Sequence, residues 1–479
     1  MTAHHLTLLL LIALIAAGCA SAPPAGQPEV GVTVPAQWTA AAEAGPAQPI
    51  WWRQFGDPAL ESLIAEALEG NRDLRAASAR VDAAAALARF AGAEQYPAVN
   101  GGFDASRRKQ NFIGLPIPGA EGRVLSTQVT TFGVALDTSW EADVWGRIRS
   151  GVAASLADAE AARFDEAAAR LSLAAQTAKA WFALIEARQQ LRLAEDTVRS
   201  YETTAGQVRE RYERGLRPPL DVRLTLSSLH SAEALLAQRQ EQFNRVLRQL
   251  ELLLGRYPAA AYQPPDALPA LPRAVPAGLP AEVLSRRPDL RAAERRIAAA
   301  DARLAADRRA LYPRLTLTGS GGIATNALRR LLDGDFSVWS LVGGVTQPIF
   351  QGGRLRARVD VSDAQAREAL ELYAGRMLGA FGEVETALDA QAHLQERAGR
   401  LAEASEQAVA ARGLAEQRYA AGLDTILAVL EAQRRQLEAE SQLLTIRRLQ
   451  LDTRVDLHLA LGGDFEDDTP AAGAGHSED

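Results

Sequence analysis

Two neighbouring tracts of the chain carry apolar residues at alternating spacings of three and four. The positions of the first tract are Leu184, Ala187, Leu191, Ala194, Val198, Tyr201, Ala205, Val208 and Tyr212. The second tract runs from Val222 to Leu254 in the same register. This spacing predicts helices that pack against each other through a heptad seam. No proline interrupts residues 147–216 or 349–469, so we expect very long helices, the first over about 147–213. A helix of that length spans about 100 Å, which indicates a rod or a tube.

The sequence also repeats itself. Asp73-Leu-Arg-Ala-Ala77 returns as Asp289-Leu-Arg-Ala-Ala293 after 216 residues, and Arg211-Tyr-x-x-Gly-Leu216 returns as Arg418-Tyr-x-x-Gly-Leu423 after 207. An offset that is constant on each side of one length change predicts a duplicated unit with one loop of variable length. A repeat of this size is too long for a solenoid, so the unit is a duplicated domain.

The chain is therefore divided into repeat 1 (50–255), a proline-rich linker (256–286) and repeat 2 (287–462). Each repeat is expected to contain a moderate helix, two strands, a very long helix, a tight turn and a second long helix. The tight turns, or tips, are expected at 214–219 and 421–425.

Four stretches between the helices show the partial alternation of strands, at about 97–109, 126–140, 313–325 and 337–348. Each has roughly the 9–11 residues that a tilted membrane strand needs. An open sheet edge cannot lie in lipid, and membrane barrels have about eight strands or more. The chain must therefore either close a barrel by oligomerising, with roughly 8, 12 or 16 strands in total, or carry a sheet that does not span a membrane.

Residues 1–18 have the pattern of a signal peptide, because the apolar run at 6–18 is too short to span a membrane. The run ends at Ala16-Ala-Gly-Cys19, which contains the only cysteine of the chain. These residues resemble the lipobox of bacterial lipoproteins, so we expect a lipid on Cys19 and a lipidated tether over 19–49. Ala20, in place of the aspartate of inner-membrane retention signals, favours the outer membrane. The alternative is an ordinary cleaved signal peptide and a cysteine without a role.

The net charge of −7 comes almost entirely from residues 463–479, which are expected to form an acidic disordered tail. The rest of the chain is nearly neutral and lacks the basic stripe that nucleic-acid binding needs. The six histidines have no ligand spacing, and the sequence contains no catalytic Ser/His/Asp pattern and no glycine-rich phosphate loop. We therefore predict that the protein is not an enzyme and has no cofactor apart from the covalent lipid on Cys19.

Several motifs together resemble one family. They are Trp51-Trp-Arg-Gln-Phe-Gly-Asp57-Pro, Asn71-Arg-Asp-Leu74, Trp140-Glu-Ala-Asp-Val-Trp-Gly-Arg147 and Pro348-Ile-Phe-Gln-Gly-Gly-Arg354. In this order, over about residues 36–462, they are similar to the TolC-like outer-membrane efflux proteins, in particular the OprM/NodT-type lipoproteins. The resemblance implies an α+β membrane protein with internal duplication. Four strands from each chain of a homotrimer would form a twelve-stranded transmembrane β-barrel, and the long helices would form a coiled-coil α-barrel.

The resemblance also implies a function. Such proteins are the exit ducts of tripartite efflux pumps and export small molecules such as drugs. Their partners are a periplasmic adaptor (membrane fusion) protein and an inner-membrane transporter, here expected to be of the RND type. The duct is held in outer-membrane lipid and extends into the periplasm. Two alternatives stay open: a lipid-anchored periplasmic coiled-coil spacer, which leaves the four strand stretches unexplained, and the exit duct of a type I protein secretion system.

The same resemblance implies a function for the two tips. In the family they form the periplasmic mouth, where the adaptor docks. The residues carried over to this docking role are Arg211, Tyr212, Gly215, Leu216, Arg418, Gly422 and Leu423. Both glycines stand where a left-handed residue commonly ends a helix.

The gate, or pore constriction, is expected at Tyr419, Asp424 and Glu431. Tyr419 matches a family tyrosine whose hydrogen bonds help to hold the closed state, and acidic residues near the constriction form cation-favouring rings. The alternatives are that the tip tyrosines only continue the heptad seam, and that the acids are a capping aspartate and a solvated glutamate. The first tip has Arg217-Pro-Pro219 where the second has Asp424-Thr-Ile426, so we expect the gate in this asymmetry.

Overall fold

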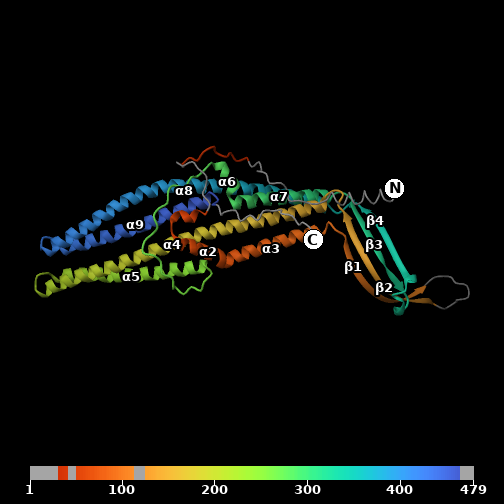
Figure 1. Cartoon of the computed structure of the whole chain (residues 1–479), viewed down its shortest axis with the longest axis horizontal. Helices are drawn as coiled ribbons and strands as arrows, with labels where there is room; N and C mark the ends of the chain where they lie inside the picture. The colour runs from red at the N-terminus through yellow and green to blue at the C-terminus, as the bar shows by residue number, and fades with distance from the viewer. Residues whose placement is uncertain (1–30, 41–49, 113–123, 464–479) are drawn as a thin grey trace, which may run out of the picture. The chain divides into compact units, whose positions relative to one another are not determined.

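The computed structural model describes residues 31–40, 50–112 and 124–463 (Figure 1). The expected signal peptide, Cys19, the tail from residue 464 and most of the loop between the first two strands lie outside the described residues. Within the described ranges, no helix combines the length and the apolar character that crossing a membrane requires.

Helices and strands follow the same order in both repeats. Repeat 1 contains η1 (Trp51–Phe55), α2 (Pro58–Gly70), α3 (Arg72–Ala93), β1 (Ala98–Phe112), β2 (Leu125–Ala142), α4 (Arg147–Glu213) and α5 (Pro219–Leu253). Repeat 2 contains α6 (Pro280–Arg286), α7 (Pro288–Arg309), β3 (Arg314–Thr325), η2 (Leu328–Arg330), η3 (Gly334–Phe336), β4 (Ser337–Thr346), α8 (Arg354–Ala420) and α9 (Ile426–Ala460). The duplication is close in length, since α4 and α8 have 67 residues each and α5 and α9 have 35. Helix α6 lies within the stretch that the sequence assigned to the linker.

The four strands form one antiparallel sheet in the order β1-β2-β3-β4, as Figure 1 shows. The pairing of β2 with β3 joins the two repeats, with Leu136 opposite Gly321 and Trp140 opposite Leu317. Gly322 is required at this junction, because a Cβ there would lie 2.1 Å from the carbonyl oxygen of Val134. Strands β1 and β4 are the two edges of the sheet.

A corner formed by Trp140 to Arg147 connects β2 to α4. Asp143 caps the helix, because its carboxylate accepts the backbone N–H groups of Ile148 (3.0 Å) and Arg149 (2.8 Å). The indole of Trp140 donates to the carbonyl of Gln95 at 2.9 Å, and that of Trp145 donates to the carbonyl of Pro313 at 2.8 Å. The motif therefore has a structural role, which is to fix the direction in which α4 leaves the sheet.

Two compact units make up the chain, and neither coincides with one repeat. The first unit takes residues 81–162 from repeat 1 and 293–372 from repeat 2, and includes the whole sheet. The second takes the described residues of 31–80, 163–292 and 373–463, and includes both tips. The repeats record the duplication of the sequence, whereas each unit is built by packing matching parts of the two copies together.

The core of the second unit lies where η1 and α2 pack on α4 and the ends of α5 and α9. Its largest members include Trp51, Leu60, Trp181 and Phe182, all fully buried. The indole of Trp181 donates to Asp57 Oδ2 at 2.7 Å. The other carboxylate oxygen of Asp57 caps α2, so one side chain links a helix start to the core.

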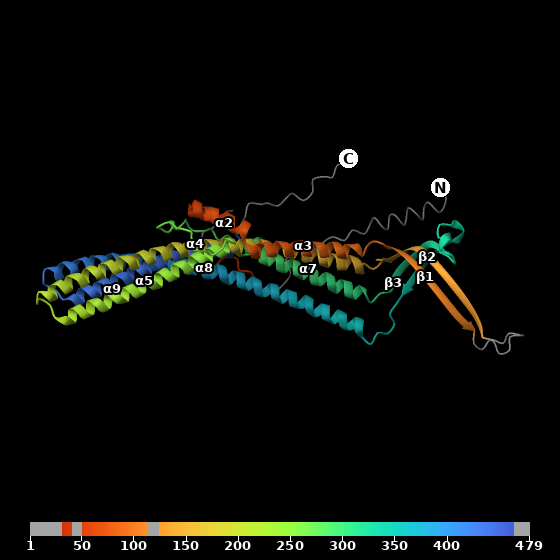
Figure 2. The same ribbon diagram turned by 90° about the horizontal axis from the view of Figure 1, so that it is seen from below.

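The heptad seam of α4 is buried as expected from Leu184 to Val208. Its last position was predicted wrongly, because Tyr212 is 43% exposed. The seam ends there because α4 itself ends at Glu213 and the chain turns. Packing between Val198 and Ala232, and a hydrogen bond between Arg412 and Gln436 at 3.0 Å, show that each long helix lies against the following one, so α4–α5 and α8–α9 are two hairpins (Figure 2).

Candidate functional site

The two tips have the same backbone geometry. In the first tip, Gly215 has φ +74°, and the N–H of Leu216 donates to the carbonyl of Arg211 at 2.8 Å. In the second, Gly422 has φ +76°, and the N–H of Leu423 donates to the carbonyl of Arg418 at 2.9 Å. This six-to-one hydrogen bond and left-handed glycine form a Schellman motif. Glycine is needed because other residues adopt this conformation only with strain.

Apolar side chains are exposed on both tips at equivalent positions. Leu216 and Leu423 are 67% and 69% exposed, and Leu220 and Leu427 follow one helical turn later with 63% and 58%. The residues expected to dock an adaptor therefore lie on the surface of the tips, except for Arg211. The guanidinium of Arg211 instead binds the carbonyls of Tyr419 (3.0 Å) and Ala420 (3.1 Å) at the end of α8.

Tyr419 and Tyr212 occupy equivalent sequence positions but different environments. Tyr419 is 2% exposed and packs against Val208, Ile426 and Val429. Its hydroxyl is buried and has no hydrogen-bond partner among the described residues. The hydrogen bonds expected for this hydroxyl are therefore absent from the described part of the chain, and apolar packing holds the ring.

Each of the two expected gate acids is paired with arginine in its own chain. Asp424 accepts the backbone N–H of Thr425 at 2.9 Å and Arg418 Nε at 3.2 Å, and these contacts hold the pKa of Asp424 below its usual value. Glu431 accepts from Arg434 at 2.9 Å and from Arg435 at 2.7 Å, and these two guanidinium groups lower its pKa to about 2. Both carboxylates are therefore ionised and largely compensated at neutral pH, which weakens any negative ring that they would form.

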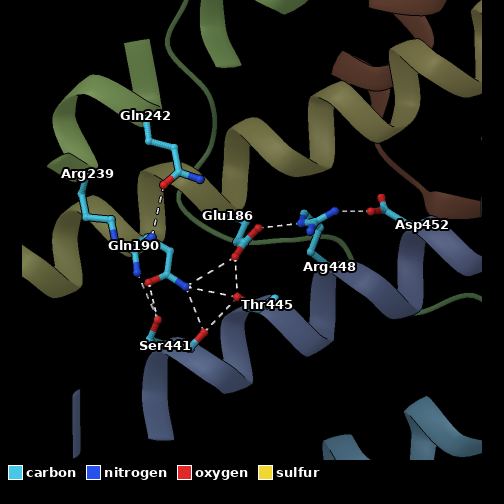
Figure 3. A network of polar contacts seen from close by, with 8 residues as sticks. All are labelled: Glu186, Gln190, Arg239, Gln242, Ser441, Thr445, Arg448 and Asp452. Atoms are coloured by element: carbon cyan, nitrogen blue, oxygen red, sulfur yellow. Dashed lines mark hydrogen bonds and ion pairs between the residues drawn. The ribbon is translucent and has the colours of Figure 1, made fainter. Parts of the chain in front are cut away.

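A ladder of polar contacts joins α4 to α9, with α5 at its side (Figure 3). Its members are Glu186, Gln190, Arg239, Gln242, Ser441, Thr445, Arg448 and Asp452. Glu186 accepts from Thr445 Oγ1 at 2.7 Å and from Arg448 Nε at 2.5 Å, and Gln190 Nε2 donates to the carbonyl of Ser441 at 2.9 Å. No sequence pattern signals these pairs, because Glu186 and Gln190 lie beside the apolar seam and their partners are more than 250 residues away.

Asp452, at one end of this ladder, is a buried carboxylate with incomplete hydrogen bonding. Its Oδ2 pairs with Arg448, whereas its Oδ1 is buried and has no hydrogen-bond partner among the described residues. Burial raises the pKa of Asp452 to about 6, although Arg448 and Lys179 act to lower it; the neighbouring carboxylates of Asp456 and Glu186 raise it further. The folded state therefore carries an unfavourable negative charge here at neutral pH.

We expect acid to stabilise the protein through this residue. Since the pKa of Asp452 is raised in the folded state, ionisation above about pH 6 opposes folding, and this penalty disappears as the pH falls toward the unfolded value near 4. Its full size is on the order of 3 kcal/mol. Melting temperatures of the wild type and Asp452→Asn at about pH 4.5 and pH 7.5, on either side of the window between the two pKa values, test this. The wild type should gain more from acidification than the variant, and an equal gain in both would contradict the assignment.

The described residues contain no group of three or more His, Cys, Asp or Glu that could hold a metal ion. Their polar clusters are ion pairs and helix caps, and the tips offer exposed leucines beside a buried tyrosine. Duplicated long helical hairpins and a four-stranded sheet shared by both repeats define the chain as a protein of the TolC-like fold.

The chain belongs to the outer membrane efflux protein family, whose sequence profile matches residues 63–256 and 279–463. The pyoverdine export outer membrane protein OpmQ of Pseudomonas putida is 34% identical over 477 residues, which cover 98% of this chain and 99% of that protein. The toluene efflux pump outer membrane protein TtgF of Pseudomonas putida is 33% identical, with 97% and 98% covered.

Solved structures give the same result. The outer-membrane channel OprN matches with a TM-score of 0.83 at 31% identity, over 93% of this chain and 99% of that one. The CmeC outer membrane channel of Campylobacter jejuni matches with a TM-score of 0.85 over 94% and 96%; at 24% identity this likeness concerns the fold alone.

Proposed function

We propose that this protein is the outer-membrane exit duct of a tripartite efflux pump. It would passively carry small molecules such as drugs from the periplasm to the exterior when coupled to an adaptor and an inner-membrane transporter. Relatives named for the export of pyoverdine and for toluene efflux support small organic cargo. The transporter partner is proposed to be of the RND type.

The two faces of the sheet carry this proposal. The strand register places two rows of residues on one face of the sheet. The first row is Phe103, Val134 and Ile323, and the second is Leu136, Gly321 and Trp339. The opposite face carries Asp104, Asp137 and Ser320 with several glycines and threonines, and its apolar members are mostly small or β-branched, such as Val129, Val338 and Val342. Alternation of this kind, apolar outward and polar inward, is the pattern of a membrane barrel with a watery interior.

The apolar face is uncovered within the described part of the chain. Trp339 is 82% exposed, Leu341 75%, Leu136 62% and Phe103 60%. A sheet packed on a core of its own chain would bury these side chains, so lipid is the favoured environment. The open edges of β1 and β4 require pairing in lipid. Three chains would give about twelve strands and close a barrel within the known size range, so we propose a homotrimer.

The expected lipid on Cys19 completes the proposal, since it would anchor the same chain to the outer membrane. The gate is proposed at the tips, with Tyr419, Asp424 and Glu431, and the adaptor would dock on the exposed leucines beside Gly215 and Gly422.

Oligomer mass and lipid labelling test these statements together. Light scattering of the purified full-length protein in detergent should give three chains per particle. Cells fed labelled palmitate should label the wild type but not Cys19→Ser, which should keep the trimer mass. A monomer in several detergents would contradict the barrel and leave the coiled-coil spacer as the better account. Equal labelling of both proteins would remove the anchor from the proposal.

A further inference from the structure

We propose that two arginines of the first tip clamp the second tip shut by gripping the aromatic ring of Tyr419, not its hydroxyl. This inference rests on the proposed duct and specifies how its gate is held. The guanidinium carbon of Arg211 lies 4.8 Å from the centre of the Tyr419 ring, and that of Arg217 lies 4.9 Å from it. Both distances are within the range of a cation–π contact.

The ring is better placed than the hydroxyl to hold the two tips together. Tyr419 is almost fully buried and both arginines are half-buried, so the contacts are partly shielded from water, which strengthens them. Its hydroxyl has no hydrogen-bond partner among the described residues. A latch based on this hydroxyl would need an acceptor that the described part of the chain does not provide.

Arg211 holds the same point of α8 in a second way. Its two terminal nitrogens donate to the carbonyls of Tyr419 and Ala420, the last residues of the helix. A helix C-terminus carries partial negative charge and unpaired carbonyls, so a guanidinium is a favourable partner there. One side chain therefore binds both the backbone end of α8 and the ring of its last buried residue.

The differences between the two repeats explain why arginines hold Tyr419 but not the equivalent Tyr212. Arg418 and Asp424 form an ion pair at 3.2 Å inside the second tip. The equivalent positions in the first tip are Arg211 and Arg217, so the acid is replaced by a second base. With a base in place of that carboxylate, both arginines are directed to Tyr419. The equivalent tyrosine of the first tip, Tyr212, is 43% exposed.

Opening of the second tip would then require Tyr419 to leave two guanidinium groups. Apolar side chains also pack in the cluster around the ring: Val208, Ile426 and Val429 are buried, and Val222, Ala415 and Leu430 are half-buried. Arg211 and Arg217 add to this packing, which makes them positioning residues of the gate. Arg217 lies in the tip asymmetry where the sequence led us to expect the gate, although it was not itself named as a gate residue.

Planar-bilayer conductance of the full-length protein tests the clamp, since no adaptor is present to confuse docking with gating. Arg211→Ala and Arg217→Ala should each raise the open fraction about tenfold, the effect of losing one shielded cation–π contact. The open fraction of Arg211→Lys should lie between those of Arg211→Ala and the wild type, because one ammonium cannot bind both carbonyls and the ring.

The tyrosine variants separate the ring from the hydroxyl. Tyr419→Phe keeps the ring and should have the open fraction of the wild type, whereas Tyr419→Leu should have a higher one. Arg214→Ala is the matched control, since Arg214 is exposed and pairs with Glu210 one helical turn away, and it should change nothing.

These results distinguish a failure of the proposed clamp from a failure of the proposed duct function. If Tyr419→Phe opens the channel as much as Tyr419→Leu, the hydroxyl is the latch and the clamp is wrong. If Tyr419→Leu conducts but neither alanine variant differs from Arg214→Ala, the clamp is wrong and the duct stands. If no variant conducts although each has the mass of a trimer, the proposed function itself fails. A melting temperature for each variant shows whether its fold is retained.

Discussion

Gly255→Ala should lower the free energy of unfolding by about 3 kcal/mol or more. Gly255 follows the end of α5 with φ +73°, a conformation that costs an alanine strain energy. In addition, a Cβ there would lie 2.4 Å from the carbonyl oxygen of Gly70 and 2.9 Å from its carbonyl carbon. Both neighbours are backbone atoms at the end of α2, so the clash can be relieved only by separating α2 from α5.

The tips provide a control that isolates the strain. Gly215 has nearly the same φ, +74°, but a Cβ added to it would meet no atom within 4 Å, so Gly215→Ala should cost only about 1 kcal/mol. Gly462, which is equivalent to Gly255 in repeat 2, would bring a Cβ within 2.9 Å of the backbone of Arg286 and Arg287, and Gly462→Ala should behave like Gly255→Ala. Melting temperatures of the three variants decide the matter. Equal losses at Gly215 and Gly255 would show that the close approach does not limit the fold.

Arg287→Met should destabilise the protein by about 1.5–3 kcal/mol, the usual cost of losing hydrogen bonds to charged groups, because the partner carboxylates of Asp289 and Glu383 stay partly exposed. The guanidinium of Arg287 binds Asp289 at 2.8 and 3.0 Å, Glu383 at 2.5 Å and the carbonyl of Ala460 at 3.2 Å. Its side chain is 10% exposed. It therefore joins the start of α7 and the middle of α8 to the end of α9.

The same variant should change the response to acid. Burial alone would raise the pKa of Asp289, but the hydrogen bonds and charge of Arg287 outweigh it and hold that pKa below its usual value. Asp289 therefore stabilises the fold above its unfolded pKa, and this contribution is lost as the pH falls through the lowered folded value. Unfolding of the wild type and Arg287→Met from pH 7 to pH 3 should show a smaller acid loss in the variant. Arg245→Ala, which removes an exposed i,i+4 pair with Glu241, is the control and should have little effect. A similar loss of stability for Arg245→Ala and Arg287→Met would refute the structural role of Arg287.

The sequence alone predicted most of the fold because its signals are local or repeated. Heptad spacing located the seam of α4, proline-free tracts located the long helices, and the offset of the repeats placed the second hairpin from the first. The duplication even extends to tertiary contacts. Asn71 Nδ2 donates to the carbonyl of Leu253 at 2.9 Å, and its equivalent Arg287 donates to the carbonyl of Ala460, the equivalent of Leu253.

The candidate site was harder to predict, because the two repeats differ in sequence and packing at the tips. Tyr212 and Tyr419 have the same local sequence, and only the packing of one tip on the other makes the second tyrosine buried. Arg217 carries no motif, and its contact with Tyr419 joins residues from different repeats. The division into units was also hidden, because each unit takes part of both repeats. These features depend on contacts between distant segments, which a local pattern does not contain.

Single-channel recording tests the central claim most directly. The full-length protein with Tyr419→Leu and Asp424→Ala, which removes both the buried ring and the acid of the second tip, should be reconstituted in a planar lipid bilayer after light scattering has established its trimer mass. A duct with its gate removed should give stepwise, long-lived conductance. A trimer of this variant that inserts into the bilayer and never conducts would contradict the account.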